Sequence, residues 1–442
     1  MTADSELDSI LQRLEVFGVR LGLETTGRLL TALGNPQEGL RAVLVAGTNG
    51  KGSTAALLAS MATAAGYRVG LYTSPHLESV EERLRIDGAA ISTESLEATV
   101  GDVVATAESR LGYLPTYFEA LTASALVWFA RESVDLAVLE VGMGGRLDAT
   151  NGCEPVLSLI TEIGLEHQRY LGRTLASIGR EKAGILRPGR PALAWVERQE
   201  ARQAIQEVAD EMGTPLSWGT SLASIVSRKD LGWDGQQVEL QTPMARHRIT
   251  LPLLGEHQVA NVALATLAAE QLATLGLDRL DHAAIAGGAA KTRWPGRLEW
   301  VLPPATKPVL LDVAHNPDGA ETLRRSLDRV EGRYVLLFGA LVDKEVSRVL
   351  PGLAERATRV VLTSPASPRA MNLEALAEMV PAAKTTIEVD RSVALSAALA
   401  AAGDFVVVCG SVYLVGDVRM ELRRRFGVPY PATANLQRQS TS

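Results

Sequence analysis

The chain has 442 residues, of which 46% are hydrophobic and 21% charged, a composition typical of globular proteins rather than disordered or fibrous ones. The formal net charge is -7 and the sequence has no dense run of Lys or Arg, which argues against a nucleic-acid-binding protein. A chain of this length exceeds one ordinary hydrophobic core, so we expect two or three domains.

Targeting and redox features point to the cytoplasm. The first twenty residues carry scattered charges and lack the apolar core of a secretory signal, and stretches such as FVVVCGSVYLVG are too short to span a bilayer. The two cysteines, Cys153 and Cys409, lie far apart in apolar strand-like segments, which favours buried free thiols over a disulfide. We expect a cytoplasmic monomer without membrane or nucleic-acid partners.

Strand-like and helix-like segments alternate through the first half of the chain. The expected strands are 42–47, 134–142 and 156–164, with a further strand that runs into a loop within 67–76. The expected helices follow a glycine-rich turn at 47–52 and cover 93–110 and 118–131. Several of these strands are apolar runs without alternation, which is typical of parallel sheets covered by helices on both faces.

The second half begins with a change of pattern. Short alternating segments with turns between 216 and 254 predict a small antiparallel region, and a long helix follows from residue 257. From residue 308 onward, PVLLDV, YVLLFGAL, RVVLTSP and FVVVCG predict strands that alternate with helices. We therefore expect an α/β protein with a P-loop-type, mostly parallel sheet domain at 1–295, a smaller Rossmann-like α/β domain at 296–425 and a tail at 426–442.

The segment VLVAGTNGKGSTAALLASMA carries the strongest functional signal. Gly47, Gly50 and Gly52 allow backbone N–H groups to point at phosphate oxygens, and the helix that follows adds its positive end. Lys51 supplies a charge for the outer phosphates, and Ser53 or Thr54 offers a hydroxyl to magnesium. We predict an ATP site formed by Asn49, Gly50, Lys51, Gly52, Ser53 and Thr54. The glycine between Lys51 and Ser53 departs from the usual phosphate loop.

Several further motifs accompany this unusual loop. GTNGKGS, LEVGMGGRLDATN, EIGLEHQRYLG, LLDVAHNPDGA and GSVYLVGDVR occur in this order along the chain. Together they resemble the folylpolyglutamate synthase and dihydrofolate synthase family, a branch of the Mur ligase superfamily. The resemblance implies ATP-dependent addition of L-glutamate to folates, and to 7,8-dihydropteroate, through an acyl phosphate.

Magnesium prefers hard oxygen ligands, and Glu140 stands at the end of a buried strand, where α/β sheets receive ligands. A turn-capping role is the alternative for Glu140. The resemblance implies two magnesium sites with ligands Ser53, Ser74, Glu140, His167 and a carbamylated Lys182. From the residues alone, Lys182 is a solvated surface lysine. The family more often has Asp where this chain has Glu166.

The resemblance also implies further ATP and catalytic residues. Asn261, Arg297 and Asp312 match ATP-contacting positions, although an Asn on an Ala-rich helix is often a packed polar group. His315, with Lys51, Lys182 and His167, is a candidate catalytic residue, and a turn role for His315 is equally compatible with its position. Arg297 lies where a second domain could bring positive charge onto the phosphates on closure.

The pterin-bearing substrate is expected at LPTYFEAL and GRLDATN. By resemblance, Phe118 stacks on the ring and Asp148 accepts hydrogen bonds from its amino group, although Phe118 also fits a core role. The full predicted set is Leu21, Thr116, Tyr117, Phe118, Glu119, Leu147, Asp148 and Ala149. Lys344 and Arg369 are candidates for contact with the incoming glutamate.

The expected chemistry is transfer of the γ-phosphoryl group of ATP to the substrate carboxylate, followed by attack of the glutamate amine. The sequence does not single out a base for that amine. Two alternatives remain at this point: a Mur-type ligase that joins an amino acid to another carboxylate substrate, and a nucleotide-switched ATPase.

Overall fold

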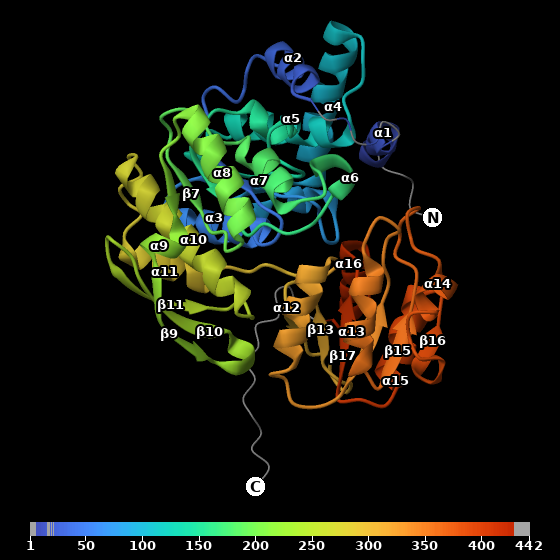
Figure 1. The fold of residues 1–442 in the computed structure, drawn as a ribbon. Helices are drawn as coiled ribbons and strands as arrows, with labels where there is room; N and C mark the ends of the chain where they lie inside the picture. The colour runs from blue at the N-terminus through green and yellow to red at the C-terminus, as the bar shows by residue number, and fades with distance from the viewer. Residues whose placement is uncertain (1–5, 16–17, 19, 21, 428–442) are drawn as a thin grey trace. The chain divides into compact units, whose positions relative to one another are not determined.

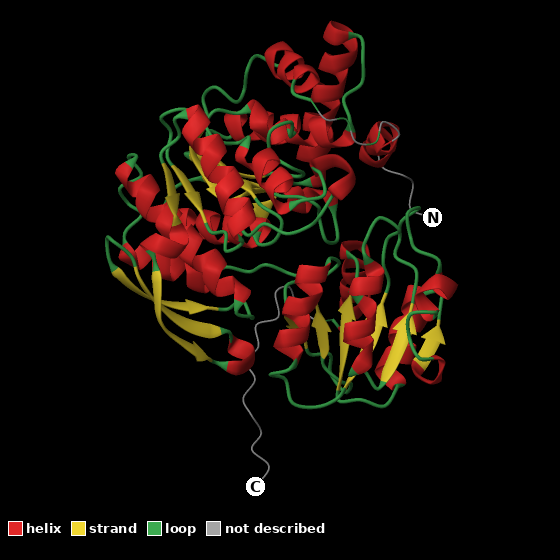
Figure 2. Ribbon diagram, in the orientation of Figure 1, coloured by secondary structure: helices red, strands yellow, loops and turns green. Residues whose placement is uncertain are grey.

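A computed structural model of the chain describes residues 6–15, 18, 20 and 22–427. It divides into two compact units. The described part of Met1–Lys229, with Gln237–Leu251 and Gln258–Thr292, forms the first unit. Asp230–Gln236, Pro252–His257 and the described part of Arg293–Ser442 form the second. Helices and strands alternate along much of the chain in both units (Figures 1 and 2).

The first unit is built on an eight-stranded sheet with the order β4-β3-β2-β5-β1-β6-β7-β8. Its strands are β1 (Ala42–Ala46), β2 (Val69–Tyr72), β3 (Leu84–Ile86), β4 (Ala89–Ala90), β5 (Leu136–Glu140), β6 (Pro155–Ile160), β7 (Ala192–Ala194) and β8 (Leu216–Trp218). Neighbouring strands in the stretch β2-β5-β1-β6-β7-β8 are parallel. The remaining strands, β3 and β4, extend the sheet beyond β2 as antiparallel neighbours. The carboxyl ends of β1, β5 and β6 therefore meet at one edge of the sheet.

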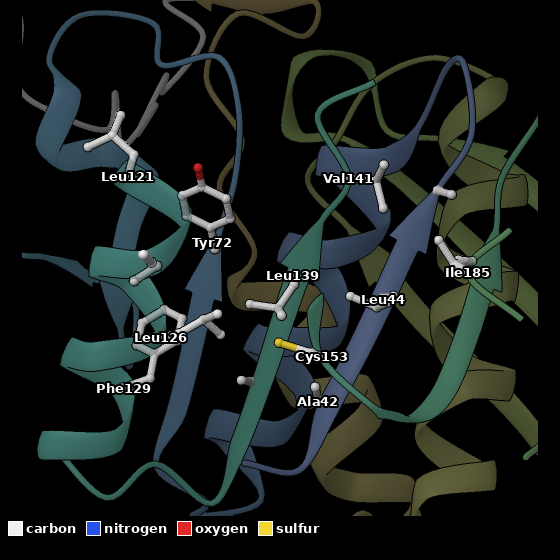
Figure 3. Close-up of a cluster of buried hydrophobic side chains, with 14 of the residues drawn as sticks. Ala42, Leu44, Tyr72, Leu121, Leu126, Phe129, Leu139, Val141, Cys153 and Ile185 are labelled. Atoms are coloured by element: carbon white, nitrogen blue, oxygen red, sulfur yellow. The ribbon is translucent and has the colours of Figure 1, made fainter. Parts of the chain in front are cut away.

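Both faces of this sheet are covered. Leu44 belongs to a core cluster with Leu126 and Phe129, which lie on the helix after Thr116 (Figure 3). Val43 and Val45 point to the other face and are also completely buried. This burial explains why the strand sequence shows no polar alternation.

Helices connect and flank the strands of the first unit. They are α1 (Glu6–Glu15), α2 (Glu24–Ala32), α3 (Lys51–Ala64), α4 (Thr93–Thr106), α5 (Tyr117–Arg131), α6 (Gln168–Leu171), α7 (Leu175–Ala183), α8 (Gln199–Met212), α9 (Gly219–Leu222), α10 (His257–Thr274) and α11 (His282–Lys291). Helices α3, α4, α5 and α10 were expected from the sequence, and the structure adds the other helices of this unit and a π-turn after α4.

A separate three-stranded sheet follows the large one, with the order β11-β10-β9. Its strands are β9 (Ser224–Asp230), β10 (Gln236–Gln241) and β11 (Arg246–Leu251), and β11 packs against α11. Residues 216–218, which we expected in this antiparallel region, instead join the large sheet as β8.

The second unit has a six-stranded sheet with the order β12-β13-β17-β14-β15-β16. Its strands are β12 (Glu299–Val301), β13 (Val309–Leu311), β14 (Tyr334–Phe338), β15 (Arg359–Leu362), β16 (Thr385–Ile387) and β17 (Phe405–Cys409), and its helices are α12 (Pro317–Leu327), α13 (Leu350–Glu355), α14 (Leu373–Ala377), α15 (Arg391–Ala400) and α16 (Val412–Phe426). The β12–β13 pair is antiparallel, and the other pairs of this sheet are parallel. The short strands β12 and β16 were not expected from the sequence.

The predicted fold class is confirmed by these two sheets. Cys153 and Cys409 are both buried and free, as predicted. Within the described residues, the structure contains no helix with the length and apolar character needed to cross a lipid bilayer.

Candidate active site

The glycine-rich loop leaves β1 and enters α3 at the carboxyl edge of the large sheet. Gly47 and Gly50 have φ values of +148° and +91°, a region that other residues rarely adopt. A Cβ atom at Gly47 would lie 1.8 Å from Thr161 Oγ1, so the loop also needs glycine for space. Gly50 directly precedes Lys51, the first residue of α3. The N–H groups of Thr48 and Asn49 donate to the Glu162 carbonyl, so a phosphate at this loop would meet the amides of the first turn of α3.

Two lysines lie against this loop. Lys51 Nζ donates to the carbonyl oxygen of Thr48 at 3.1 Å, and Lys182 Nζ donates to that of Gly47 at 2.5 Å. Lys182 is only 4% exposed, and burial together with the nearby charge of Lys51 lowers its pKa to about 7. Lys182 is therefore not the solvated lysine that its sequence context suggested.

A buried hydrogen-bond network ties α10 to the start of α3. Gln258 Nε2 donates to Ser53 Oγ at 3.3 Å, and Asn261 Nδ2 donates to Gln258 Oε1 at 2.8 Å. Thr54 Oγ1 donates to Asn261 Oδ1 at 3.5 Å, a distance at the limit of hydrogen bonding. The structure thus brings Asn261 to the phosphate loop from a distant part of the chain.

The predicted metal ligands come from neighbouring strands. Glu140 ends β5 in register with Val45 of β1, and its carboxylate accepts a hydrogen bond from the backbone N–H of Ser74 at 3.1 Å. His167 follows β6, the other neighbour of β1, and has the positive φ value of 50°. Its Nε2 lies 3.8 Å from a carboxylate oxygen of Glu166. Glu140, Ser74 and His167 thus lie at or after the carboxyl ends of strands, at the sheet edge where the phosphate loop also lies.

These residues fit a magnesium ion through the chemistry of their donors. The hydroxyls of Ser53 and Ser74 and the buried carboxylate of Glu140 are hard oxygen donors, as Mg²⁺ prefers. Within the described ranges, no three His, Cys, Asp or Glu side chains are grouped so that they could hold a metal ion by themselves. The predicted ligand set therefore depends on hydroxyls, phosphates and the modification of Lys182.

Two of the predicted pterin-binding residues converge on Gly142. A Cβ atom there would lie 2.5 Å from Phe118 Cζ and 3.3 Å from Asp148 Oδ2. The ring of Phe118 is half-buried, with its centroid 6.1 Å from that of Tyr72. Burial raises the pKa of Asp148, which accepts hydrogen bonds from the backbone of Met143 and from Thr150. Phe118 and Asp148 thus lie beside the same backbone position, and Phe118 also packs against the hydrophobic core of the first unit.

Other predicted substrate residues serve the start of α5. The Thr116 hydroxyl accepts from Glu119 N at 3.2 Å, and the Glu119 carboxylate accepts from Thr116 N at 2.8 Å, which forms a capping box. Glu119 also accepts from the hydroxyls of Thr25 and Thr26. Its carboxylate is thus engaged within the protein.

The remaining members of this set have varied surroundings. Ala149 is buried and follows Asp148, whereas Leu147 is half-buried. The guanidinium carbon of Arg83 lies 5.1 Å from the Tyr117 ring centroid. Leu21 lies outside the described residues.

In the second unit, Asp312 and His315 follow β13. Arg297 precedes β12, the strand that pairs with β13. Asp312 is buried and accepts from the backbone N–H groups of Leu298 and Ala314, both at 2.9 Å. Burial raises the pKa of Asp312, and the charge of nearby Arg297 partly opposes this shift. His315 Nδ1 donates to the Val313 carbonyl at 2.8 Å. The structure therefore gathers these three residues around two adjacent strands.

The two candidates for glutamate contact also lie together in the second unit. Lys344 follows β14 and Arg369 follows β15, and Val342 N donates to the Arg369 carbonyl at 2.9 Å. The Arg369 guanidinium lies 3.6 Å from a carboxylate oxygen of Asp343, an exposed pair. The loops that carry them thus leave the sheet at the same edge.

Gln258 was not among the residues singled out from the sequence. It is fully buried and contacts both Ser53 and Asn261. The signal that could have revealed it is the spacing GEHQVAN, because residues three apart on a helix share a face.

Comparison with known proteins shows which family the chain is similar to. The Mur ligase middle domain matches residues 45–269, and the Mur ligase glutamate ligase domain matches residues 296–412. The dihydrofolate synthase/folylpolyglutamate synthase of Bacillus subtilis is 35% identical over 417 residues, which cover 92% of this chain and 96% of that protein. The chain belongs to the folylpolyglutamate synthase/dihydrofolate synthase family.

Solved structures of this family have the same fold. Escherichia coli FolC in complex with DHPP and ADP has a TM-score of 0.83 and 33% identity, over 96% of this chain and 99% of that one. A bifunctional folylpolyglutamate synthase/dihydrofolate synthase with Mn, AMPPNP and L-glutamate bound has a TM-score of 0.81 and 33% identity, with the same coverage. The family prediction made from the sequence is therefore confirmed.

Proposed function

We propose that this chain uses ATP to join L-glutamate to the carboxyl group of folates and of 7,8-dihydropteroate. Its family membership makes it an ATP-dependent ligase that adds glutamate to folates. One observation of the structure supports the proposal for its site: the loop from Gly47 to Thr54 leads into the N-terminus of α3 and adjoins both Lys182 and Asn261.

The chain's own residues account for activation of the carboxylate. Lys51 and the loop amides hold the outer phosphates of ATP and stabilise negative charge while the γ-phosphoryl group moves to the substrate carboxylate. Phe118 and Asp148 orient the pterin, so that the carboxylate points toward that phosphoryl group. The glutamate amine then attacks the acyl phosphate and phosphate leaves.

Magnesium would be held by Ser53, Ser74, Glu140, His167 and modified Lys182, and when bound it would neutralise charge on the phosphates. The backbone N–H of Ser74 fixes one carboxylate oxygen of Glu140, which orients this side chain in advance. Related structures hold ADP or Mn with AMPPNP, in support of nucleotide and divalent-metal use.

Carbamylation of Lys182 is part of the proposal. The neutral amine attacks carbon dioxide, a proton is released and a carbamate forms, which supplies the anionic oxygens that an ammonium lacks. Burial of Lys182 favours the neutral amine. Because Lys182 Nζ donates to the Gly47 carbonyl, a carbamate on this side chain would lie beside the phosphate loop. Intact mass spectrometry under bicarbonate should show one added carbon dioxide in the wild type and none in Lys182→Met.

In the second unit we propose that Arg297, Asp312 and His315 serve ATP and the reacting groups, and that Lys344 and Arg369 serve glutamate. The functional domains are proposed to be 1–295 and 296–425. A monomeric state and a cytoplasmic location also stay predictions, and light scattering coupled to size-exclusion chromatography tests the first.

An acceptor-dependence assay tests the function. Purified protein with ATP, magnesium and glutamate should release phosphate only when a folate or dihydropteroate is added. Lys51→Ala should lower kcat/KM for ATP at least about a hundredfold, whereas Lys229→Ala, at an exposed position, should retain full activity. Phosphate release without an acceptor would instead favour a nucleotide-switched ATPase.

A further inference from the structure

Gln258 occupies an unusual place for a glutamine. Its side chain is fully buried at the first turn of α10, where burial of an amide is unfavourable unless its polar atoms are paired. Both ends of the amide have partners, since Nε2 donates to Ser53 Oγ and Oε1 accepts from Asn261 Nδ2. These two partners are the residues proposed to meet magnesium and ATP.

The direction of these hydrogen bonds has a chemical consequence at Ser53. A hydroxyl has one proton and two lone pairs. Because Gln258 donates to the Ser53 oxygen, one lone pair is occupied, and the serine proton cannot turn toward Gln258. The other lone pair and the proton then remain for a metal ion and a phosphate oxygen.

The same amide fixes Asn261. An asparagine side chain can rotate by half a turn and exchange its oxygen and nitrogen. In the structure Asn261 Nδ2 donates to Gln258 Oε1 at 2.8 Å, so the two amides hold each other in one matched orientation. Asn261 Oδ1 then faces the loop, where a Cβ atom at Gly50 would lie 2.3 Å from it.

We infer that Gln258 is a positioning residue for the nucleotide and metal site, acting by fixing the hydroxyl of Ser53 and the amide of Asn261. This inference rests on the proposed nucleotide site and adds a residue that its motif does not contain. Partners behind metal ligands commonly affect metal affinity by roughly 10–100-fold when they are removed.

A binding experiment with the full chain tests this role. Mn²⁺ is titrated in the presence of AMPPNP and followed by electron paramagnetic resonance, so the readout does not require turnover or an acceptor. We expect Gln258→Met, which has a similar length and no amide, to weaken Mn²⁺ binding roughly 10-fold or more. In a Ser53→Ala background, the part of this loss that acts through Ser53 should disappear, so the same substitution should weaken Mn²⁺ binding clearly less than it does when Ser53 is present.

Gln236→Leu is the matched control. Gln236 is 1% exposed, and its amide donates to the carbonyls of Leu253 and Gly255, so its loss also removes a buried glutamine. Thermal unfolding should show destabilisation for both glutamine variants, but only Gln258→Met should lose Mn²⁺ affinity. If Gln258→Met does not fold, Gln258→Glu keeps the side-chain size and the acceptor for Asn261 but removes the donor to Ser53.

The double-mutant comparison decides the outcome for either Gln258 variant. An effect on Mn²⁺ affinity that is clearly smaller in the Ser53→Ala background supports the inference. Unchanged Mn²⁺ affinity, or effects of the two substitutions that simply add, would overturn it. If Mn²⁺ and AMPPNP bind as expected but no acceptor supports ligation, the proposed function fails while the role of Gln258 stands.

Discussion

Lys182 shows how a residue's surroundings change its chemistry. In water a lysine is a cation at neutral pH, but Lys182 is buried beside Lys51, and both features lower its pKa to about 7 from the ordinary 10.5. The folded chain therefore holds this proton less tightly than the unfolded chain. A lowered pKa favours the neutral amine that the proposed carbamylation of Lys182 requires.

This pKa shift predicts a dependence of stability on pH for the unmodified amine. Between about pH 7 and 10.5 the unfolded chain binds more protons at this site than the folded chain, so the free energy of unfolding should rise with pH. Lys182→Met has no such proton, so its stability relative to the wild type should fall as pH rises through that range. Urea unfolding at several pH values in carbon-dioxide-free buffer measures the difference.

Lys229→Met provides the control, because Lys229 is exposed. Its stability difference from the wild type should be the same at each pH. If the stability difference between Lys182→Met and the wild type also stayed constant with pH, the assignment of a lowered pKa to Lys182 would be contradicted.

At the scale of elements, the turn between β1 and α3 depends on glycine for two reasons. Gly50 has a φ value of +91°, and a Cβ atom there would also lie 2.3 Å from Asn261 Oδ1. Gly112 has a φ value of +72°, but a Cβ atom at Gly112 would have no heavy atom of the described residues within 4 Å beyond its immediate chain neighbours. The two glycines thus share the backbone conformation and differ in what surrounds them.

Gly50→Ala and Gly112→Ala should therefore separate backbone strain from site geometry. Each should cost about 1–2 kcal/mol of stability, because alanine is disfavoured at positive φ. Only Gly50→Ala should also abolish AMPPNP binding, since its methyl group displaces Asn261 or the loop. Calorimetric titration and thermal unfolding of both variants test this, and normal AMPPNP affinity in Gly50→Ala would contradict it.

Glu119, at the start of α5, has two candidate roles. It was predicted to contact substrate, but in the structure its carboxylate completes a capping box. Glu119→Ala should lower the free energy of unfolding by about 1–3 kcal/mol, since buried donors lose their acceptor. Chemical denaturation measures this, with Glu108→Ala as control at an exposed ion pair, where a change within about 0.5 kcal/mol is expected. A stable Glu119→Ala protein that loses only acceptor binding would favour the substrate role.

Much of the whole molecule could be predicted from local patterns. Runs such as AVLVA and LAVLE are buried on both faces, so their lack of alternation predicted a covered parallel sheet. Short strands such as β12 and β16 were missed because three residues carry too little periodicity. Lys182 was expected on the surface from its residue context, and Gln258 was overlooked, since burial and partners distant along the chain are set by tertiary packing.

The division into two units gives the last prediction, which concerns Arg297. Lys51 and the phosphate loop belong to the first unit, whereas Arg297 belongs to the second, where Leu298 N is held by Asp312. If Arg297 stabilises charge on the phosphoryl group during its transfer, as proposed, Arg297→Met should lower kcat about a hundredfold and leave ATP affinity nearly unchanged. Arg329→Met, at an exposed ion pair of the same unit, should change neither value. Parallel measurement of ATP binding and turnover distinguishes the cases, because a loss of ATP affinity equal to the loss of turnover would mean that Arg297 contributes to ground-state binding rather than to the transfer step.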